Sequence, residues 1–373
     1  MTSKIPYRAL FLGAGPQMQC GVGQFTIRLH DAVESLTPGS CASLTLTAGE
    51  GSLPAIWRAV GSADTVVCNF PIVAWKRVIL KPLLAMAMAR LRRRRVLLIQ
   101  HEWGSLHRLR RLTYLPALWL ADTIMMFSPL VRRELADDPI AGRFNRKCVL
   151  APLPPVTATP PTTTDSELRR RLAAARRDGR LVLGHFGSIY PGKQPQVLLD
   201  IASILKRRGL RPLTVYVGSF IRALDGVEQD FNRRLEQLGL TDDVIVTGYV
   251  ESEQDVFGLF GEIDVFCYIL DEGLTARRTS ILTVAQSQRP VVVTAASEAG
   301  EFDHHPRFRD LIESGAILCV PRGVSNEQYA DSIVAARSRP PSNRPFDFNG
   351  WWLDLAQAVH RQLRVPPESG RQS

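Results

Sequence analysis

The feature that most constrains the fold is an alternation of short apolar runs with helix-length segments, repeated on both sides of a proline- and threonine-rich stretch. Apolar runs occupy positions 7–12, 42–46, 65–68, 96–100 and 123–127 in the first half, and 181–186, 213–217, 244–247, 265–269 and 291–294 in the second. The segments between them, such as 24–35, 194–208 and 227–238, have the length and apolar spacing of helices. This alternation is typical of parallel sheets with crossover helices. It predicts an α/β protein with two sheet-based domains.

The stretch 151–165 marks the boundary between the two domains. It reads APLPPVTATPPTTTD, and proline at this density excludes both a helix interior and a central strand. We predict a first domain over 1–155, a linker over 156–166, a second domain over 167–340 and a C-terminal segment over 341–373. The last segment contains a helical pattern at 351–363, and we expect this helix to cross back onto the first domain.

Composition and charge restrict the function. The chain of 373 residues has 45% hydrophobic residues and a formal net charge of +10, which fits two globular domains with anionic partners. Its six cysteines are scattered without a CxxC pair, which argues against a zinc site or a disulfide framework and favours a reducing cytosol. The apolar run at 9–12 is too short for a signal peptide, and no run reaches the ~18 apolar residues of a membrane span. We therefore expect a cytoplasmic protein.

A glycine-rich turn follows the predicted strand 181–186. The segment GHFGSIYPGK ends at Lys193 and leads directly into a predicted helix. Glycines let a backbone approach a ligand, and a helix N-terminus offers free N–H groups and the positive end of its dipole. Lys193 would add a point charge for a pyrophosphate. On this segment alone, an ordinary βα turn with a surface lysine is an equally good interpretation.

A second polar segment follows the predicted strand 265–269. The segment YILDEGLTARRTS, which ends at Ser280, brings an acid, hydroxyls and paired arginines to the carboxyl end of that strand. Ligands of open α/β sheets bind at the carboxyl ends of strands. A solvated loop with incidental charge is the alternative. Together the two segments favour an anion-binding site at one edge of the second sheet.

The order of the motifs in the second half resembles a known family. It runs from Gly187 and Lys193 through VIVTGYV, which ends at Val250, to Glu272 and Gly273, and then to RPVVVT at 289–294. This order is similar to that of the donor domain of retaining family-4 glycosyltransferases, also called glycosyl transferases group 1, which have the GT-B fold. The resemblance implies two Rossmann-like domains whose parallel sheets face each other across a cleft that holds the donor.

The first half contributes two weaker motifs to the same resemblance. CGVGQFT, which begins at Cys20, looks like the first glycine loop of the family. QHEW at 100–103, followed by HRLRR at 107–111, is similar to a family segment that lines the acceptor side. A satisfied histidine at the end of a strand is an equally good interpretation of His101.

The chain departs from the family pattern at two positions. Ser188 stands where the family has an arginine, and Ser280 stands where it has a second glutamate, eight residues after Glu272. The segment up to Pro290 is longer than usual, so an alignment made backwards from that proline puts Thr283 at the second-glutamate position. The glutamate that usually contacts the ribose is therefore missing. We interpret the chain as a member of a divergent subgroup.

The resemblance implies roles for individual residues. The candidates for catalysis are Glu272, Lys193, Arg277 and His101. The candidates for donor binding are Gly21, Gly23, Gly187, Ser188, Lys193, Val250, Glu272, Gly273, Thr275, Arg277, Arg278 and Ser280. The candidates on the acceptor side are His101, Glu102, Arg108 and Arg111. Negative charge grows on the pyrophosphate as the sugar leaves, and each preorganised donor can contribute ~3–4 kcal/mol.

Cofactors and partners follow from the same roles. Cationic side chains would do the work of a metal, and the Asp-His-His cluster at 303–305 lacks further ligands, so we expect no metal and no other cofactor. The expected partners are a nucleotide sugar and a glycan or lipid-linked acceptor. The segment 78–95 joins an apolar stretch to a basic end, which favours peripheral binding to the cytoplasmic face of an anionic membrane over a core helix with a solvated end.

The sequence thus favours a retaining hexosyltransferase that moves a sugar from a nucleoside diphosphate sugar to an acceptor in polysaccharide or glycoconjugate assembly. A GT-B sugar-nucleotide epimerase is an alternative, since it would share the two-domain plan. A catalytically silent nucleotide-binding or scaffold relative is another, because of Ser188 and the missing glutamate. A phosphorylase is disfavoured by the short chain. A nucleic-acid-binding protein is disfavoured because no aromatic residues interleave with the basic run.

Overall fold

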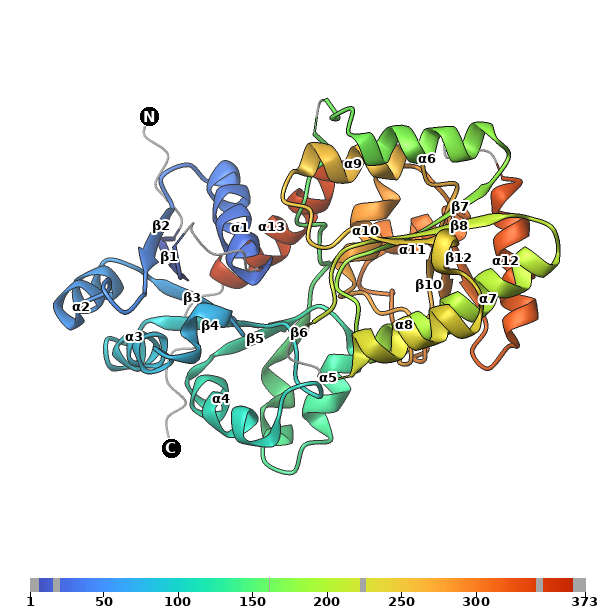
Figure 1. Ribbon diagram of the computed structural model, residues 1–373. Coiled ribbons are helices and arrows are strands. Elements are labelled where there is room, and N and C mark those ends of the chain that lie inside the picture. Colours follow the sequence, from blue (N-terminus) through green and yellow to red (C-terminus); the bar gives the residue numbers. More distant parts are fainter. Residues whose placement is uncertain (1–6, 16–20, 161, 222–225, 340–344, 365–373) are drawn as a thin grey trace. The chain divides into compact units, whose positions relative to one another are not determined.

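The computed structural model describes residues 7–15, 21–160, 162–221, 226–339 and 345–364 (Figure 1). The chain forms two compact units. The first consists of Met1–Val156 and Phe348–Ser373, and the second of Thr157–Asp347. The last helix therefore belongs to the first unit, and the second unit is a single continuous segment.

The first unit is built on a parallel sheet with the strand order β2-β1-β3-β4-β5-β6. Its strands are β1 (Ala9–Gly13), β2 (Cys41–Thr45), β3 (Thr65–Phe70), β4 (Arg95–Gln100), β5 (Thr123–Met126) and β6 (Cys148–Leu150). Its helices are α1 (Gly21–Leu36), α2 (Leu53–Gly61), α3 (Leu80–Leu91), α4 (Arg108–Leu120), α5 (Pro129–Ala136) and α13 (Phe348–Arg364), with two short 3-10 turns at Val73–Lys76 and Gly142–Lys147. In the register, Ala9 of β1 pairs with Cys41 on one side and Thr65 on the other.

Two apolar cores cover the two faces of this sheet. On one face, alternate residues of β1, β3 and β4 pack against α2, α3 and α4. On the other face, the remaining residues of the same strands pack against α1 and α13. Both faces are covered because every strand is parallel to its neighbours and each crossover places a helix on one face or the other. The Trp352 indole of α13 also donates to the backbone carbonyl of Pro155, at 3.0 Å.

The second unit is built on another parallel sheet, with the strand order β12-β11-β10-β7-β8-β9. Its strands are β7 (Leu181–Phe186), β8 (Pro212–Val217), β9 (Val244–Val246), β10 (Val265–Tyr268), β11 (Val291–Thr294) and β12 (Ile317–Val320). Its helices are α6 (Glu167–Arg177), α7 (Pro195–Arg207), α8 (Val227–Gln237), α9 (Glu253–Gly261), α10 (Thr279–Ala285), α11 (Pro306–Glu313) and α12 (Asn326–Arg337), with 3-10 turns at Pro191–Lys193 and Thr241–Asp243. The helices α7, α8 and α12 cover one face around a shared apolar core (Figure 1).

The predicted α/β class with two parallel sheets is confirmed. All ten predicted strands are present, with ends shifted by at most two residues. The sequence analysis missed β6 and β12, which are short strands at the edges of the two sheets. It also missed α12, in a region where the apolar pattern is weak; there a capping box between Ser325 and Gln328 begins the helix.

Candidate active site

The strand order identifies one edge of the second sheet as the place to look for a ligand. The chain proceeds from β7 outward to β8 and β9, and then returns to the other side of β7 to build β10, β11 and β12. The crevice at such a reversal, outside the carboxyl ends of the strands, is where open α/β sheets bind ligands. Here those ends belong to β7 and β10, and they carry the two segments that the sequence analysis singled out.

Gly187 brings the backbone after β7 close to two polar residues. Its φ is +102°, a conformation that favours glycine, and an added Cβ would lie 3.0 Å from the Lys193 ammonium and 3.5 Å from the Ser280 Cβ. Lys193 and Ser280 are 87 positions apart in the chain, and both lie beside the turn at Gly187. A side chain at position 187 would separate them.

Lys193 lies in the glycine-rich turn just before helix α7, and its side chain is buried. It ends a 3-10 turn, and α7 begins only at Pro195, after Gln194 in a left-handed conformation with φ +44°. Its side chain is 5% exposed and its ammonium donates to the Phe186 carbonyl at 3.4 Å. The interpretation as a surface lysine is therefore wrong, because the turn directs the side chain back toward the end of β7.

Burial and a neighbouring charge set the protonation of Lys193. Desolvation, and then repulsion from the Arg278 guanidinium, lower the pKa of Lys193 to about 7. The ammonium lies 5.6 Å from the ring centroid of Tyr190 and 5.9 Å from that of Tyr268. Aromatic faces attract a cation, but here they only partly compensate for the lost water. An anionic ligand would raise this pKa and hold the lysine protonated.

The loop after β10 is held in place by its backbone. Gly273 has a φ of +74°, and a Cβ there would come within 2.2 Å of the Ala295 carbonyl oxygen. The Thr294 hydroxyl accepts a hydrogen bond from the Leu270 amide at 3.1 Å. The buried Glu301 carboxylate accepts one from the Ala276 amide at 2.8 Å. These contacts fix the loop on both sides of Glu272 before any ligand is bound.

Glu272 joins the two arginines that follow it. One Arg277 nitrogen donates to both Glu272 carboxylate oxygens, at 3.0 and 3.1 Å. Arg278 donates to the same carboxylate and to the Tyr190 hydroxyl, the latter at 2.6 Å. Burial opposes the charge on Arg278, but Tyr190 and Glu272 outweigh it and raise the pKa of Arg278. Both guanidinium groups are therefore held in place by the same carboxylate.

The resulting cluster combines three cations with unused donors. The cations are Lys193, Arg277 and Arg278, and the acid that pairs with both arginines is Glu272. The carboxylates of Asp271 and Glu301 are bound to Gln194 and to the Ala276 amide instead. Within the described part of the chain, the Nε atoms of both arginines and the hydroxyl of Thr275 are buried without a hydrogen-bond partner. Buried polar groups are normally satisfied, so these donors favour an anionic ligand with several oxygens.

The remaining donor-side candidates of the second unit differ in position. Ser188 is exposed beside the cluster. Val250 follows the edge strand β9, two strands away from β7. Thr283, the backward-aligned position of the missing glutamate, is buried within α10 and donates to the Thr279 carbonyl at 2.9 Å. Of the two serine and threonine candidates for that position, only Ser280 therefore lies beside Gly187.

In the first unit, Gly21 and Gly23 open helix α1. Gly21 is exposed, and Cys20, which begins the predicted glycine loop, lies outside the described residues. Gly23 is buried and lines a pocket of about 330 Å³ between β1, β2 and α1. The Thr26 hydroxyl in the same pocket donates to the Val22 carbonyl at 2.8 Å. This pocket belongs to the first unit alone.

His101 follows β4 and is kept neutral. Its ring packs edge-on against Phe25, with centroids 5.0 Å apart, and tilted against Phe127, with centroids 5.1 Å apart. Its Nε2 lies 3.4 Å from the Asn69 side-chain oxygen. Burial among these rings lowers the pKa of His101 to about 3. His101 can therefore exchange hydrogen bonds as a neutral imidazole, but it does not carry a charge near neutral pH.

The other acceptor-side candidates lie in and after the loop that follows β4. Glu102 accepts a hydrogen bond from the Ser105 hydroxyl at 3.2 Å. Arg108 is exposed at the first position of α4. Arg111 donates to the carbonyls of Leu106, at 3.0 Å, and Gly104. Arg111 thus holds the loop in place. Of the two arginine candidates, Arg108 is therefore the one whose charge is free to contact an acceptor.

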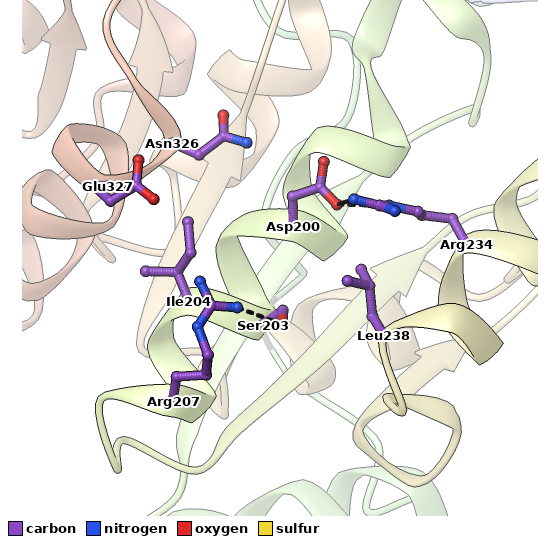
Figure 2. A pocket seen from close by; sticks show the side chains of 8 residues that line it. All are labelled: Asp200, Ser203, Ile204, Arg207, Arg234, Leu238, Asn326 and Glu327. Carbon is purple, nitrogen blue, oxygen red and sulfur yellow. Dashed lines mark hydrogen bonds and ion pairs between the residues drawn. The ribbon is translucent and has the colours of Figure 1, made fainter.

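A polar pocket elsewhere in the second unit contains none of the predicted site residues. It has a volume of about 270 Å³ and lies between α7, α8 and α12. Figure 2 shows its lining: Asp200, Ser203, Ile204, Arg207, Arg234, Leu238, Asn326 and Glu327. Its arginines already have partners within it, since Arg234 donates to Asp200 at 2.7 Å and Arg207 to Ser203 at 3.1 Å. We therefore place the candidate site at the Lys193 cluster and not here.

Two residues of the cluster were missed from the sequence. Tyr190 lies inside the glycine-rich segment, and its position between Gly187 and Lys193 was the only signal. Glu301 gave no signal, because it reaches the loop from 25 residues further along the chain. Within the part of the chain that the structure describes, no group of three or more histidine, cysteine or acidic residues is placed to hold a metal ion.

Comparisons with known proteins bear on the fold and on the family. Residues 180–337 match the family model described as Glycosyl transferases group 1. The structure of HepE from Anabaena in complex with UDP has a TM-score of 0.56 and 17% identity, over 95% of each chain. The same protein with UDP and glucose has a TM-score of 0.58 and 15% identity, over 96% of this chain and 95% of that one. A search of curated proteins finds no match.

A glycosyltransferase from Rickettsia africae has a TM-score of 0.55 and 14% identity, over 96% of this chain and 93% of its own. At these identities the likeness establishes the fold, which extends over both units. The fold is therefore the two-domain GT-B fold of solved glycosyltransferases, and most of the second unit matches the glycosyl transferases group 1 family.

Proposed function

We propose that this protein transfers a sugar from a nucleoside diphosphate sugar to a glycan or lipid-linked acceptor, with retention at the anomeric carbon, in polysaccharide or glycoconjugate assembly. The observation that carries the proposal is the cluster of Lys193, Arg277 and Arg278 at the carboxyl ends of β7 and β10. It lies within the part of the chain that matches the group 1 family. HepE, which shares the fold, was solved in complex with UDP-glucose.

The cluster suits the leaving group of such a transfer. The bond between the anomeric carbon and the pyrophosphate oxygen breaks, a bond to the acceptor oxygen forms, and the acceptor proton passes to an oxygen of the departing phosphate. Charge grows on the pyrophosphate in the transition state, where preorganised cations are most effective. Lys193 and Arg278 are preorganised by burial and by Tyr190. In this proposal no metal ion is needed to neutralise the phosphates.

Glu272 has two tasks in the proposal. Its carboxylate orients both arginines, and its remaining lone pairs are available to sugar hydroxyl groups. Ser280 and Thr283 are the two candidates for the position of the family's second glutamate. Both carry a hydroxyl group and neither carries a carboxylate. A hydroxyl contact from Ser280 to the nucleoside is therefore the simplest substitute, since Ser280 lies beside Gly187.

Binding of candidate donors tests the proposal. We would measure thermal stability with UDP, GDP, dTDP and their common sugars, because a ligand at ~100 times its Kd stabilises the native state by about 2.7 kcal/mol. We expect a selective shift that is lost in Lys193→Met. The matched control is Arg208→Gln, which removes an exposed cation paired with Asp331 at the other end of α7. No shift with any nucleotide, or an equal loss in both variants, would refute the proposal.

An epimerase would bind the same donors, so the products must be examined. With a bound nucleotide sugar and no acceptor, an epimerase converts the donor to its stereoisomer, whereas a transferase leaves it intact or hydrolyses it slowly. We expect no stereoisomer by anion-exchange chromatography and NMR. Accumulation of an epimerised donor at a rate that depends on Glu272 would replace the transferase proposal by the epimerase.

A further inference from the structure

Helix α3 of the first unit has an apolar outer face. Leu80, Leu84 and Leu91 follow one another at helical spacing along one line of the helix, and their exposed fractions are 69%, 42% and 77%. The opposite face of α3 is buried through Ala85, Met86 and Ala89. A helix on the surface of a soluble domain normally has polar residues on its outer face. Helix α3 is apolar on both faces.

Helix α4 repeats this pattern. Leu109, Leu112, Pro116 and Trp119 are all exposed and lie on one line of the helix. The exposed fractions of the three larger side chains are 68%, 50% and 69%, respectively. Figure 1 shows α3 and α4 in the same unit, and the two helices contact each other directly. We call the exposed residues of these two lines together the α3–α4 face. Contiguous exposed apolar patches of this kind mark interaction sites.

The charge around the α3–α4 face is mostly positive. Residues 65–121 contain eleven lysines and arginines and one acid, Glu102. Arg77, Arg93 and Arg108, at the ends of the two helices, are exposed and have no ion pair among the described residues. An apolar surface rimmed mainly by cations is complementary to an apolar layer with an anionic boundary.

The arginine run at 90–95 suggested membrane binding in the sequence. It offers fewer free cations to a membrane than its total charge implies. Arg90 pairs with Asp122, and Arg94 pairs with Asp64 at 3.4 Å. The Arg92 guanidinium lies over the Trp57 ring, 3.8 Å from its centroid. Arg95 donates to the Gln362 carbonyl at 2.5 Å. Most of the run is therefore engaged within the unit, and the free cations lie at the helix ends instead.

A groove opens between the beginnings of the two helices. It has a volume of about 310 Å³ and is lined by Trp75, Ile79, Leu109, Arg110, Thr113 and Tyr114. Arg110 donates to the Tyr114 hydroxyl at 3.1 Å, so its charge is held at the rim while the rings form apolar walls. Leu109 belongs both to this groove and to the α3–α4 face.

We propose that the α3–α4 face docks on an anionic lipid bilayer. The leucines and Trp119 enter the interface between headgroups and acyl chains, and Arg77, Arg93 and Arg108 contact the lipid phosphates. Tryptophan is favoured at this depth because its ring is apolar and its N–H polar. In the described part of the chain, no helix has the length and hydropathy needed to cross a bilayer, and α3 and α4 lie flat in this arrangement. The proposal does not depend on sugar transfer.

Lipid is favoured over a protein partner by the chemistry of the face. An apolar protein partner would leave Arg77 and Arg108 beside its own surface, where they would need carboxylates at matched positions. A lipid surface needs no such match, because its phosphates are mobile. A second copy of this chain is disfavoured in particular, since two α3–α4 faces would bring like charges together.

Vesicle sedimentation of the full chain tests the proposal. We expect binding to phosphatidylglycerol–phosphatidylcholine vesicles and much weaker binding to phosphatidylcholine alone. The triple variant Leu109→Ser, Leu112→Ser and Trp119→Ser should weaken binding by about tenfold or more. The double variant Arg77→Gln and Arg108→Gln should weaken it several-fold and reduce its salt dependence. All five side chains are exposed, so the variants should fold as the wild type does.

A matched triple variant serves as control. Ile140, Tyr249 and Leu353 are exposed to 45%, 63% and 41%, the first two in loops and the third on α13. Their replacement by serine should leave vesicle binding unchanged. The proposal is overturned if the wild type does not bind anionic vesicles, or if the α4 triple variant binds them as strongly as the wild type does. It is also overturned if the wild type self-associates in solution while that variant is monomeric. Donor binding, measured separately, keeps this test distinct from that of the proposed function.

Discussion

The two sheets have related topologies and very different chemistry at their carboxyl edges. In the second unit, the edge between β7 and β10 carries three cations, a carboxylate that pairs with two of them, and buried donors that have no partner among the described residues. In the first unit, the edge after β4 carries a neutral His101 between two phenylalanine rings, and Arg111 is bound to backbone carbonyls. A parallel sheet thus provides the position of a site, and the side chains decide whether it attracts an anion.

Burial has opposite consequences at the two edges. In the second unit, Tyr190 and Glu272 compensate the desolvation of Arg278, so its charge is retained. In the first unit, desolvation lowers the pKa of His101, so the neutral form is favoured. A buried charge persists only where partners replace the water that it loses. The contrast predicts that the binding of anionic donors depends on the cations of the second unit.

Removing Arg278 should have the largest effect on donor binding. Arg278→Gln deletes a buried cation from the cluster, and we expect a loss of about 2–4 kcal/mol in donor affinity, on the order of a hundredfold. The matched control is Arg110→Gln in the first unit, because Arg110 also donates to a tyrosine hydroxyl. Calorimetric titration of both variants measures the effect. Equal losses would remove the distinction between the two units.

The second-largest effect is expected from glycine substitutions, which should destabilise the second unit and not the first. Gly273→Ala places a Cβ against the Ala295 carbonyl in a left-handed conformation, and we expect about 2–3 kcal/mol of destabilisation together with loss of donor binding. Gly21→Ala in the first unit meets no atom within 4 Å and should leave the stability nearly unchanged. Chemical denaturation of both variants provides the test. A neutral Gly273→Ala would contradict the geometry of the loop.

The pH dependence of donor binding should be smaller and should come from the second unit. Lys193 has a pKa lowered to about 7, so its protonated, anion-binding form is lost as the pH rises through that value. UDP-glucose affinity should therefore fall above about pH 7, by at most tenfold per unit. The pyrophosphate of UDP-glucose does not titrate in this range. Lys193→Met should give a flat profile, and a wild-type profile that rises with pH would rule out this role.

The smallest effect concerns the stability of the first unit. The pKa of His101 is about 3 when folded and near 6.5 in the unfolded chain. The unfolded chain therefore binds more protons between these values, and stability falls as the pH is lowered through 6.5. Between pH 7.5 and 6 the loss should be about 1 kcal/mol. His101→Asn should reduce this loss in unfolding experiments, and an unchanged pH dependence would show that His101 is not buried in solution.

Much of the fold and part of the site could be predicted from the sequence. The order of strands and helices follows from apolar periodicity, which is local, and the ends of the strands located Gly187, Lys193 and the loop from Glu272 to Arg278. The edge strands β6 and β12 were not predicted, because with three and four residues they are too short to show a clear apolar pattern. The family match over residues 180–337 agrees with the motif order that suggested it.

What the sequence determined by itself was the alternation of strands and helices, and the chemical types of residue that follow the strands. Only the tertiary structure decided which of them meet. Tyr190 reaches Arg278 across 88 positions because β7 and β10 are neighbours in the sheet, and no local pattern encodes that pairing. Likewise, Lys193 is buried and the outer faces of α3 and α4 are exposed because packing, and not the order of residues, assigns each side chain to the interior or to the surface.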